Sequence, residues 1–223
     1  MKNSYFLLLL FFISQTIMTQ TSIEWEQNYG GSSRETLDAI LPTDDGGFLL
    51  AGESESSDGD VGGNHGKFDY WVVKIDSLSN LEWEQNYGGS DIDRLKSLNK
   101  TDDGGFLLAG TSHSDDVDLG DVLNISFQYW VVKINSTGNI EWQRLYGGSR
   151  EILRSVVNTK DGGFLLGGSS SSAIGDVGGN NGNDDFWVSK INLTELIETG
   201  IPTIEPTHLT VYPNPNEGIL ALQ

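Results

Sequence analysis

The sequence predicts an all-β protein, a propeller-like array of three four-stranded antiparallel blades that is either open or completed by oligomerisation. Three observations support this prediction. One sequence unit occurs three times at a spacing of about 58 residues. Each unit contains four short strand patterns separated by turn signals. None of the units shows the 3.6-residue periodicity of an amphipathic helix.

Three motifs recur in the same order in each unit, and their spacing divides the chain into repeats 23–80, 81–139 and 140–192. All six tryptophans fall at two repeat-equivalent positions. The motifs are WEQNYGGS (from Trp25, Trp83 and, as WQRLYGGS, Trp142), DGGFLL (from Asp45, Asp103 and Asp161) and YWVVKI (from Tyr70, Tyr129 and, as FWVSKI, Phe186).

Four strands are expected in the first repeat, at 23–29, 35–43, 48–52 and 70–75. Polar and apolar residues alternate in 23–29, so this strand has one wet face and is expected to lie outermost. The Asp-Asp-Gly-Gly sequence at 44–47 predicts a tight hairpin. The apolar strand 48–52 is expected between neighbouring sheets. Short connections make each unit an antiparallel meander.

Three blades leave two unpaired faces, because propellers close with about 4 to 8 blades. A β-solenoid or prism is the alternative fold, although solenoid coils usually take about 20 to 30 residues. Three arrangements are consistent with three blades: two chains complete a ring, the blades form an open stack, or the chain is a shortened member of a longer-repeat family. The end faces are expected at Leu37, Phe48 and Leu50 and at Val188 and Ile191, and such apolar faces predict a homo-oligomer.

The first twenty residues have the layout of a secretory signal peptide. Lys2 precedes an apolar run from Tyr5 to Ile13, which is too short to span a bilayer. We therefore interpret 1–20 as a signal peptide and expect a secreted or cell-surface protein. Residues 193–207 carry one glycine and two prolines and are interpreted as a linker.

The combination of YGGS, DGGFLLAG, GDVGGN and YWVVKI over residues 23–192 resembles the secreted β-propeller-like repeat proteins common in Bacteroidota. From His208, the string HLTVYPNPNEG is similar to the opening of the type A C-terminal sorting domain of the type IX secretion system. This second resemblance implies export towards the type IX route, with its machinery as a partner. The family's domain continues through further strands, so 208–223 is interpreted as a truncated sorting domain. Retention in the periplasm is the alternative if this domain is inactive.

Composition excludes several classes of function. The net charge of −19 opposes binding to phosphate backbones and therefore excludes nucleic acid as a partner. The absence of cysteine excludes a disulfide framework, a thiolate zinc site and a cysteine nucleophile. No Gly-x-Ser-x-Gly elbow, His-Glu-x-x-His motif or phosphate-binding loop occurs. We therefore expect no enzyme activity.

Two acidic, glycine-rich loops are candidates for calcium binding, because calcium takes carboxylate and amide oxygens on a flexible loop. The corresponding loop of the second repeat has a different spacing and lacks the glycine pair. The alternative is that these residues close turns between strands. The candidate ligands are Asp58, Asp60, Asn64 and Asp69 in the first repeat and Asp176, Asn180 and Asp184 in the third.

Other recurring residues are interpreted as structural. The tryptophans of the YWVVKI motif are expected to be buried between sheets. A recurring lysine is expected to pair with a carboxylate inside its blade, and an acid recurs at the start of the second strand. The residues are Trp71, Trp130 and Trp187, Lys74, Lys133 and Lys190, and Glu35, Asp93 and Glu151.

The expected function is that of a non-catalytic, secreted or cell-surface repeat protein acting as a binding or structural module, with an extracellular glycan or protein as candidate ligand. The alternative is a glycan-active enzyme of the glycoside hydrolase type, or a carbohydrate-binding accessory domain. Glycoside hydrolysis needs only two suitably placed carboxylates, and the chain has 32 acidic residues.

Overall fold

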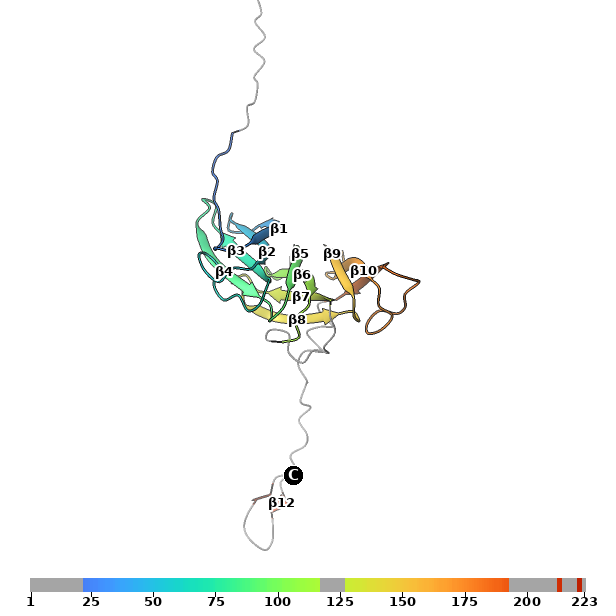
Figure 1. Ribbon diagram of the computed structural model, residues 1–223. Coiled ribbons are helices and arrows are strands. Elements are labelled where there is room, and N and C mark those ends of the chain that lie inside the picture. Colours follow the sequence, from blue (N-terminus) through green and yellow to red (C-terminus); the bar gives the residue numbers. More distant parts are fainter. Residues whose placement is uncertain (1–21, 117–126, 193–211, 214–219, 222–223) are drawn as a thin grey trace, which may run out of the picture.

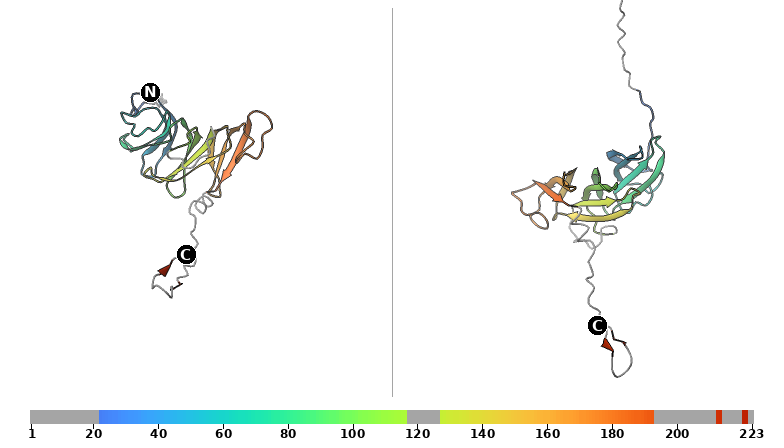
Figure 2. Two further views of the ribbon diagram at one scale, coloured as in Figure 1. Left: turned by 60° about the horizontal axis from the view of Figure 1, so that its bottom comes forward. Right: turned by 180° about the vertical axis from the view of Figure 1, so that it is seen from behind.

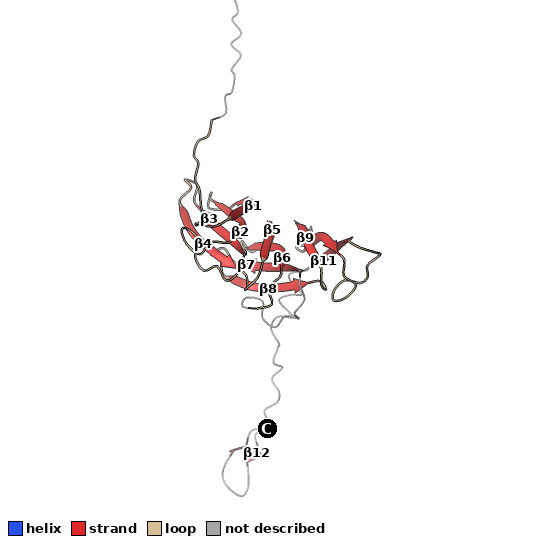
Figure 3. Cartoon of the chain, viewed as in Figure 1, coloured by secondary structure: helices blue, strands red, loops and turns tan. Residues whose placement is uncertain are grey.

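The computed structural model describes residues 22–116, 127–192, 212–213 and 220–221. Every regular element in this part of the chain is a β-strand, in agreement with the predicted all-β class (Figure 3). The predicted signal peptide (1–20) and linker (193–207) lie outside the described residues. Of the predicted sorting segment, two short strands are described, β12 (Tyr212–Pro213) and β13 (Leu220–Ala221), which pair in antiparallel fashion.

Eleven strands between residues 35 and 191 form three antiparallel sheets of four, four and three strands, and none of the sheets is closed. Strands that are adjacent in sequence pair within each sheet, so each sheet is a meander. Sheet 1 contains β1 (Glu35–Pro42), β2 (Phe48–Ser54), β3 (Asp69–Ile75) and β4 (Leu81–Tyr87); sheet 2 contains β5 (Asp93–Lys100), β6 (Phe106–Ser112), β7 (Gln128–Ile134) and β8 (Ile140–Tyr146); sheet 3 contains β9 (Glu151–Asn158), β10 (Phe164–Ser170) and β11 (Asp185–Ile191).

The sheets are out of phase with the sequence repeats. The strand that opens the second and third repeats, β4 or β8, pairs with β3 or β7 of the preceding repeat. Both strands are outermost in their sheets, as the alternation predicts. The prediction of a strand at 23–29 is wrong, because this segment forms no strand and is largely exposed. The three predicted blades would contain twelve strands, and the described residues between 23 and 192 form eleven.

The hairpin predicted at 44–47 is confirmed as the connection between β1 and β2. Gly46 has a φ of 86°, a left-handed conformation that glycine adopts without steric cost. The Asp45 carboxylate accepts hydrogen bonds from the Thr43 hydroxyl and the Gly47 N–H. These bonds close the turn and fix the register of the two strands.

The three sheets follow one another around an arc (Figure 1). β1, β5 and β9 lie along the inner rim, where β5 contacts both β1 and β9, and β4 and β8 lie along the outer rim. The view from behind shows the same succession of sheets (Figure 2). We call the side of a sheet that faces the preceding sheet its front face, and the side that faces the following sheet its back face.

Two hydrophobic cores hold the sheets together, and each core joins the back face of one sheet to the front face of the next. Burial of this apolar surface is the main source of stability. The back face of sheet 1 presents Leu49, Ala51, Tyr70 and Val72 to the front face of sheet 2, with Leu95, Phe106, Leu108, Trp130, Val132 and Ile134. The back face of sheet 2 presents Leu107, Ala109, Tyr129 and Val131 to the front face of sheet 3, with Leu153, Val156, Phe164, Leu166 and Ile191.

A tyrosine–tryptophan pair recurs in each core. The ring centroids of Tyr70 and Trp130 are 4.5 Å apart, and the Tyr70 hydroxyl donates to the Trp130 carbonyl at 3.1 Å. Tyr129 and Trp187 repeat both contacts, at 4.7 Å and 3.3 Å. The predicted burial of the tryptophans is confirmed for Trp71 and Trp130, whereas Trp187 is only half-buried. Trp130 lies between two sheets as predicted, but Trp71 lies on the front face of sheet 1.

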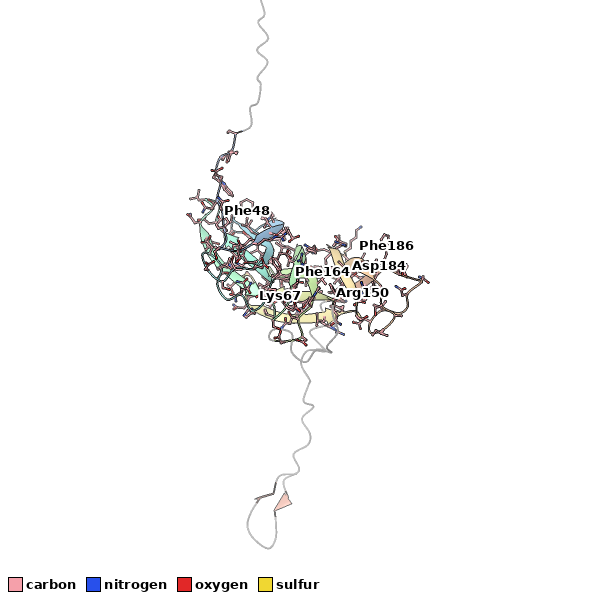
Figure 4. The ribbon with its side chains drawn as sticks, viewed as in Figure 1. Phe48, Lys67, Arg150, Phe164, Asp184 and Phe186 are labelled. Atoms are coloured by element: carbon pink, nitrogen blue, oxygen red, sulfur yellow. The ribbon has the colours of Figure 1, made fainter. Side chains whose placement is uncertain are left out.

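Each end of the row of sheets carries exposed apolar side chains, as the sequence predicts. Leu37 is exposed on the front face of sheet 1, and Val188 and Phe186 are exposed on the back face of sheet 3. Figure 4 shows Phe186 at the end opposite Phe48. The assignment of Ile191 to an end face is wrong, because its side chain points towards sheet 2 and is buried.

A β-bulge interrupts the pairing of the innermost strand with its neighbour in each sheet, and a recurring glycine allows the two strands to approach closely there. A Cβ atom on Gly110 would lie 1.9 Å from the Arg94 carbonyl oxygen and 2.6 Å from the Tyr70 hydroxyl. We expect Gly110→Ala to lower the free energy of unfolding by about 1–3 kcal/mol, because the backbone must shift to admit the methyl group. Urea unfolding measures this change. Gly178→Ala is the matched control, since a Cβ there meets no atom within 4 Å. Equal midpoints for the two variants would contradict the analysis.

Candidate functional site

The candidate calcium ligands Asp58 and Asp60 accept hydrogen bonds from the loop that follows residues 23–29. The Asp60 carboxylate accepts from the Gly30 N–H at 3.1 Å, and the Asp58 carboxylate accepts from the Ser32 N–H at 2.7 Å. Glu35 accepts from the Gly31 N–H at 3.3 Å. Three consecutive N–H groups are thus bound by three carboxylates, and we call this arrangement the acidic clasp.

Each of the other two units repeats two of the three hydrogen bonds of the acidic clasp. In the third, the Gly147 and Gly148 N–H groups donate to Asp176 and Glu151 at 3.0 and 2.9 Å. In the second, the Gly89 and Ser90 N–H groups donate to Asp93 and Asp116 at 2.8 and 2.7 Å. The recurring acids Glu35, Asp93 and Glu151 therefore bind backbone N–H groups. They are not the carboxylates that pair with the recurring lysines.

The recurring lysines do pair with carboxylates of their own sheets, as predicted. The Lys74 ammonium lies 2.9 Å from Asp45 and 2.5 Å from Glu82. Lys133 lies 3.0 Å from Asp103 and 2.5 Å from Glu141, and both lysines are buried. Each glutamate belongs to the outermost strand that the following repeat supplies. Lys190 in sheet 3 binds Asp161 and is exposed.

Of the remaining calcium candidates, two asparagines close turns and Asp184 is exposed to solvent. The Asn64 amide donates to the Ser54 carbonyl at 2.9 Å, and Asn180 donates to Ser170 in the same way at 3.1 Å. Asp184 is exposed at the far end of the third sheet (Figure 4). Residues 22–116 and 127–192 contain no group of three or more His, Asp or Glu side chains placed to hold a metal ion. The geometry supports the turn-closing interpretation, and calcium binding stays a prediction.

Asp69, the fourth candidate of the first repeat, belongs to a buried acidic pair at the junction of sheets 1 and 2. Asp69 and Asp93 are both 0% exposed, and one oxygen of each carboxylate has no hydrogen-bond partner. A Cβ on Gly88 would lie 2.4 Å from Asp69 Oδ1 and 2.9 Å from Asp93 Oδ2, so the two carboxylates flank this glycine. The other Asp69 oxygen accepts from the His65 N–H at 2.7 Å.

Burial controls the protonation of this pair. It raises the pKa of Asp69 to about 6, against the opposing effects of the His65 hydrogen bond and charge. Burial also raises the pKa of Asp93 and lowers the pKa of the nearby His113. Carboxyl groups with such environments resemble general acids, but a substrate has to touch the acid that protonates it. Full burial of both carboxylates prevents that contact.

The sequence gives the two members of the buried acidic pair different interpretations. Asp69 is a calcium candidate, and Asp93 is one of the acids that recur at the start of the second strand. A signal was present, because Gln128 stands at the position equivalent to Asp69, and the acid equivalent to Asp93 is a longer glutamate in the other repeats. Repeat comparison therefore marks the combination of residues as singular, although it does not show that the two acids are neighbours.

An open apolar groove lies on the front face of sheet 1, with a volume of about 380 Å³. Its walls are the segment before Gly30 and the front face of β1, β2 and β3. The sequence predicts the apolar face with Leu37 and Leu50 but not the groove, because Trp25 is expected in a strand. The lining side chains include Trp25, Tyr29, Leu37, Ile40, Leu50 and Trp71.

Comparison with known proteins adds no family assignment: no family model matches the chain, and no curated protein matches it. Among the described residues there is no helix with the length and apolar character that a membrane span requires.

We expect Asp69→Asn to stabilise the protein at pH 7 and to have little effect near pH 4. The folded carboxyl group titrates near pH 6, well above its ordinary value of 3.8, so the folded state binds the extra proton between these values. The contribution of Asp69 to stability therefore falls as the pH rises from about 4 to 6, and the full penalty persists above pH 6.

Chemical unfolding of the wild type and Asp69→Asn at several pH values measures this difference. The asparagine keeps an acceptor for the His65 N–H, and Asp184→Asn is the control because that side chain is exposed. If the difference in unfolding free energy between the wild type and Asp69→Asn does not change with pH, burial does not raise the pKa of Asp69.

The calcium prediction has its own test. A cation that binds only the folded state raises the melting temperature by mass action. Because the clasp carboxylates already bind N–H groups, we expect the same melting temperature in EDTA and in excess calcium. If calcium raises the melting temperature of the wild type but not that of Asp58→Asn, the loop that contains Asp58 binds calcium.

Proposed function

We propose that the chain is a non-catalytic repeat module that acts outside the cell as a structural or binding unit. The burial of Asp69 and Asp93 carries the proposal, because these neighbouring acids have raised pKa values and yet are both 0% exposed. Other recurring carboxylates bind backbone N–H groups or lysines, so their chemistry supports the fold.

The propeller-like arrangement is part of this proposal. Three antiparallel sheets stand side by side around an arc, and each packs its back face on the next sheet. Four-stranded meanders packed face to face are the units of a propeller, whereas a solenoid stacks its coils along one axis. These features favour blades over solenoid coils.

Location outside the cell rests on the two ends of the sequence. The run from Tyr5 to Ile13 has the length of a signal-peptide core, and the string from His208 is similar to a type IX sorting domain. The net charge of −19 suits a soluble module and disfavours anionic partners. We propose the type IX machinery as the export partner.

Carbohydrate binding is a second candidate function, and the apolar groove on sheet 1 favours it. Trp25 is 47% exposed there, and an exposed aromatic ring can stack on a sugar. Under this alternative, Trp25→Ala weakens binding to a polysaccharide, whereas Ile174→Ala, at another exposed apolar position, does not.

We expect the purified chain to release no reducing sugar from soluble polysaccharides. The assay combines a reducing-end measurement with co-sedimentation of the chain on insoluble polysaccharides, so that binding and hydrolysis are measured separately. Hydrolysis that disappears in both Asp69→Asn and Asp93→Asn would contradict the proposal. Binding without hydrolysis would favour the carbohydrate-binding candidate.

A further inference from the structure

We infer that copies of this chain assemble head to tail, and that residues 23–29 of one copy form the missing outermost strand of sheet 3 in another copy. The proposal does not depend on ligand binding or on the route of export. It rests on a comparison of the strand motif in its three positions.

The sequence contains three copies of the outer-strand motif, and two of them are paired in the structure. IEWEQNY at 23–29 differs from LEWEQNY in β4 only at the first residue. β4 and β8 are hydrogen-bonded along β3 and β7, whereas 23–29 forms no strand. Among the described residues, β11 is an edge strand with no partner on its outer side. The described part of the chain thus has one unpaired copy of the outer-strand motif and one sheet that lacks an outer strand.

The side chains of β11 show what the absent strand supplies elsewhere. Lys74 and Lys133 each bind a glutamate of the outer strand, and their side chains are 6% and 2% exposed. Among the described residues, the Lys190 side chain forms an ion pair with Asp161 alone, and it is 49% exposed. Glu24 of the 23–29 segment corresponds to Glu82 and Glu141. An incoming segment would therefore bring the missing carboxylate to Lys190.

The tryptophan of β11 leads to the same conclusion. The Trp71 indole N–H donates to Glu84 at 2.9 Å, and the Trp130 indole N–H donates to Gln143 at 3.2 Å. Both acceptors lie at the same position of the outer strand, where residues 23–29 carry Glu26. Trp187 is half-buried, and pairing with 23–29 would give it the equivalent cover and acceptor.

The segment already has the required position relative to its own sheet 1. The Tyr87 hydroxyl at the end of β4 donates to the Gly138 carbonyl of sheet 2 at 2.6 Å. The Tyr29 hydroxyl donates to the equivalent carbonyl, that of Ser79, at 2.5 Å. The end of segment 23–29 therefore contacts sheet 1 in the same way as the end of β4 contacts sheet 2. The sheet that receives them has to lie against the front face of sheet 1.

The two apolar end faces complement each other in that position. The front face of sheet 1 corresponds, residue for residue, to the front face of sheet 2 that packs on sheet 1. The back face of sheet 3 carries Phe186, which is 96% exposed and equivalent to the buried Tyr70 and Tyr129. In the assembly, Phe186 packs on Trp71 of the next copy, and sheet 3 fills the apolar groove.

The pairing of β3 with β4 also predicts the register. Val72 pairs with Gln85 and Trp71 pairs with Asn86. The equivalent intermolecular partners are Val188 with Gln27 and Trp187 with Asn28. Two copies joined in this way would supply six sheets, which can close a ring, and an unclosed contact would extend into a longer row.

Disulfide trapping tests the register directly, because the chain has no cysteine of its own. A Gln27→Cys chain is mixed with a Val188→Cys chain and oxidised mildly. We expect a two-chain product on a non-reducing gel, and a much smaller yield when Glu26→Cys replaces Gln27→Cys, because adjacent strand residues point to opposite faces. Equal yields for the two pairs, or no cross-link in either, would overturn the proposal.

Light scattering after size exclusion tests the assembly without cross-linking. We expect the wild type to contain two or more chains, with association strengthened by salt because each copy carries a net charge of −19. Gln27→Pro removes an N–H from the donated strand and should give monomers, whereas Ser22→Pro, outside the strand, should not.

Both proline variants should keep the melting temperature of the monomer, since residues 22–29 belong to no sheet within one chain. A wild type that stays monomeric at low and high salt would overturn the proposal. A cross-link between Cys substitutions at 27 and 188 within one doubly substituted chain, at monomer mass, would also overturn it.

Discussion

Backbone pairing of β4 with β3, and of β8 with β7, is the interaction on which the rest of the structure depends. Each sheet receives its outermost strand from the following repeat, so no repeat forms a complete sheet from its own residues. The same strands bring the glutamates that neutralise two buried lysines and the acceptors for two indole N–H groups. Sheet completion, charge compensation and core formation are therefore coupled.

The excess of acid over base has a structural explanation in the acidic clasps. A chain with 32 acidic and 13 basic residues cannot pair most of its carboxylates with cations. In each repeat the Gly-Gly-Ser loop offers successive N–H groups instead, and carboxylates from the neighbouring loop and the innermost strand accept them. Hydrogen bonds of this kind are stronger than neutral ones, because the acceptor is charged.

Local features were predictable from the sequence, and long-range pairing was not. Turn residues such as Asp45 and Gly46 set a hairpin by themselves, and the alternation in each strand shows which face is apolar. The period of a repeat is the same wherever it is divided, so periodicity alone cannot show that Leu81–Tyr87 completes the sheet of the preceding unit. The alternation of residues in 23–29 predicts a strand, but a strand forms only where another strand pairs with it.

In the candidate site, too, local features were predictable from the sequence and long-range contacts were not. Clusters of Asp, Asn and Gly marked the loops correctly, but the choice between binding a cation and binding N–H groups depends on the distant loop that each carboxylate meets. Asp60, for example, accepts from Gly30, thirty residues away in the sequence. The buried acidic pair joins Asp69 and Asp93 across two sheets, and no spacing rule within one repeat relates them.

The phase shift between repeats and sheets also sets an order of events as the chain emerges from the ribosome. Sheet 1 cannot be completed until residues 81–87 have emerged, and sheet 2 has to wait for residues 140–146. Until then, Lys74 or Lys133 lacks its glutamate and the outer edge of β3 or β7 is open to other strands. Folding therefore advances one repeat behind synthesis, and each new sheet edge is exposed only until the next repeat has been made.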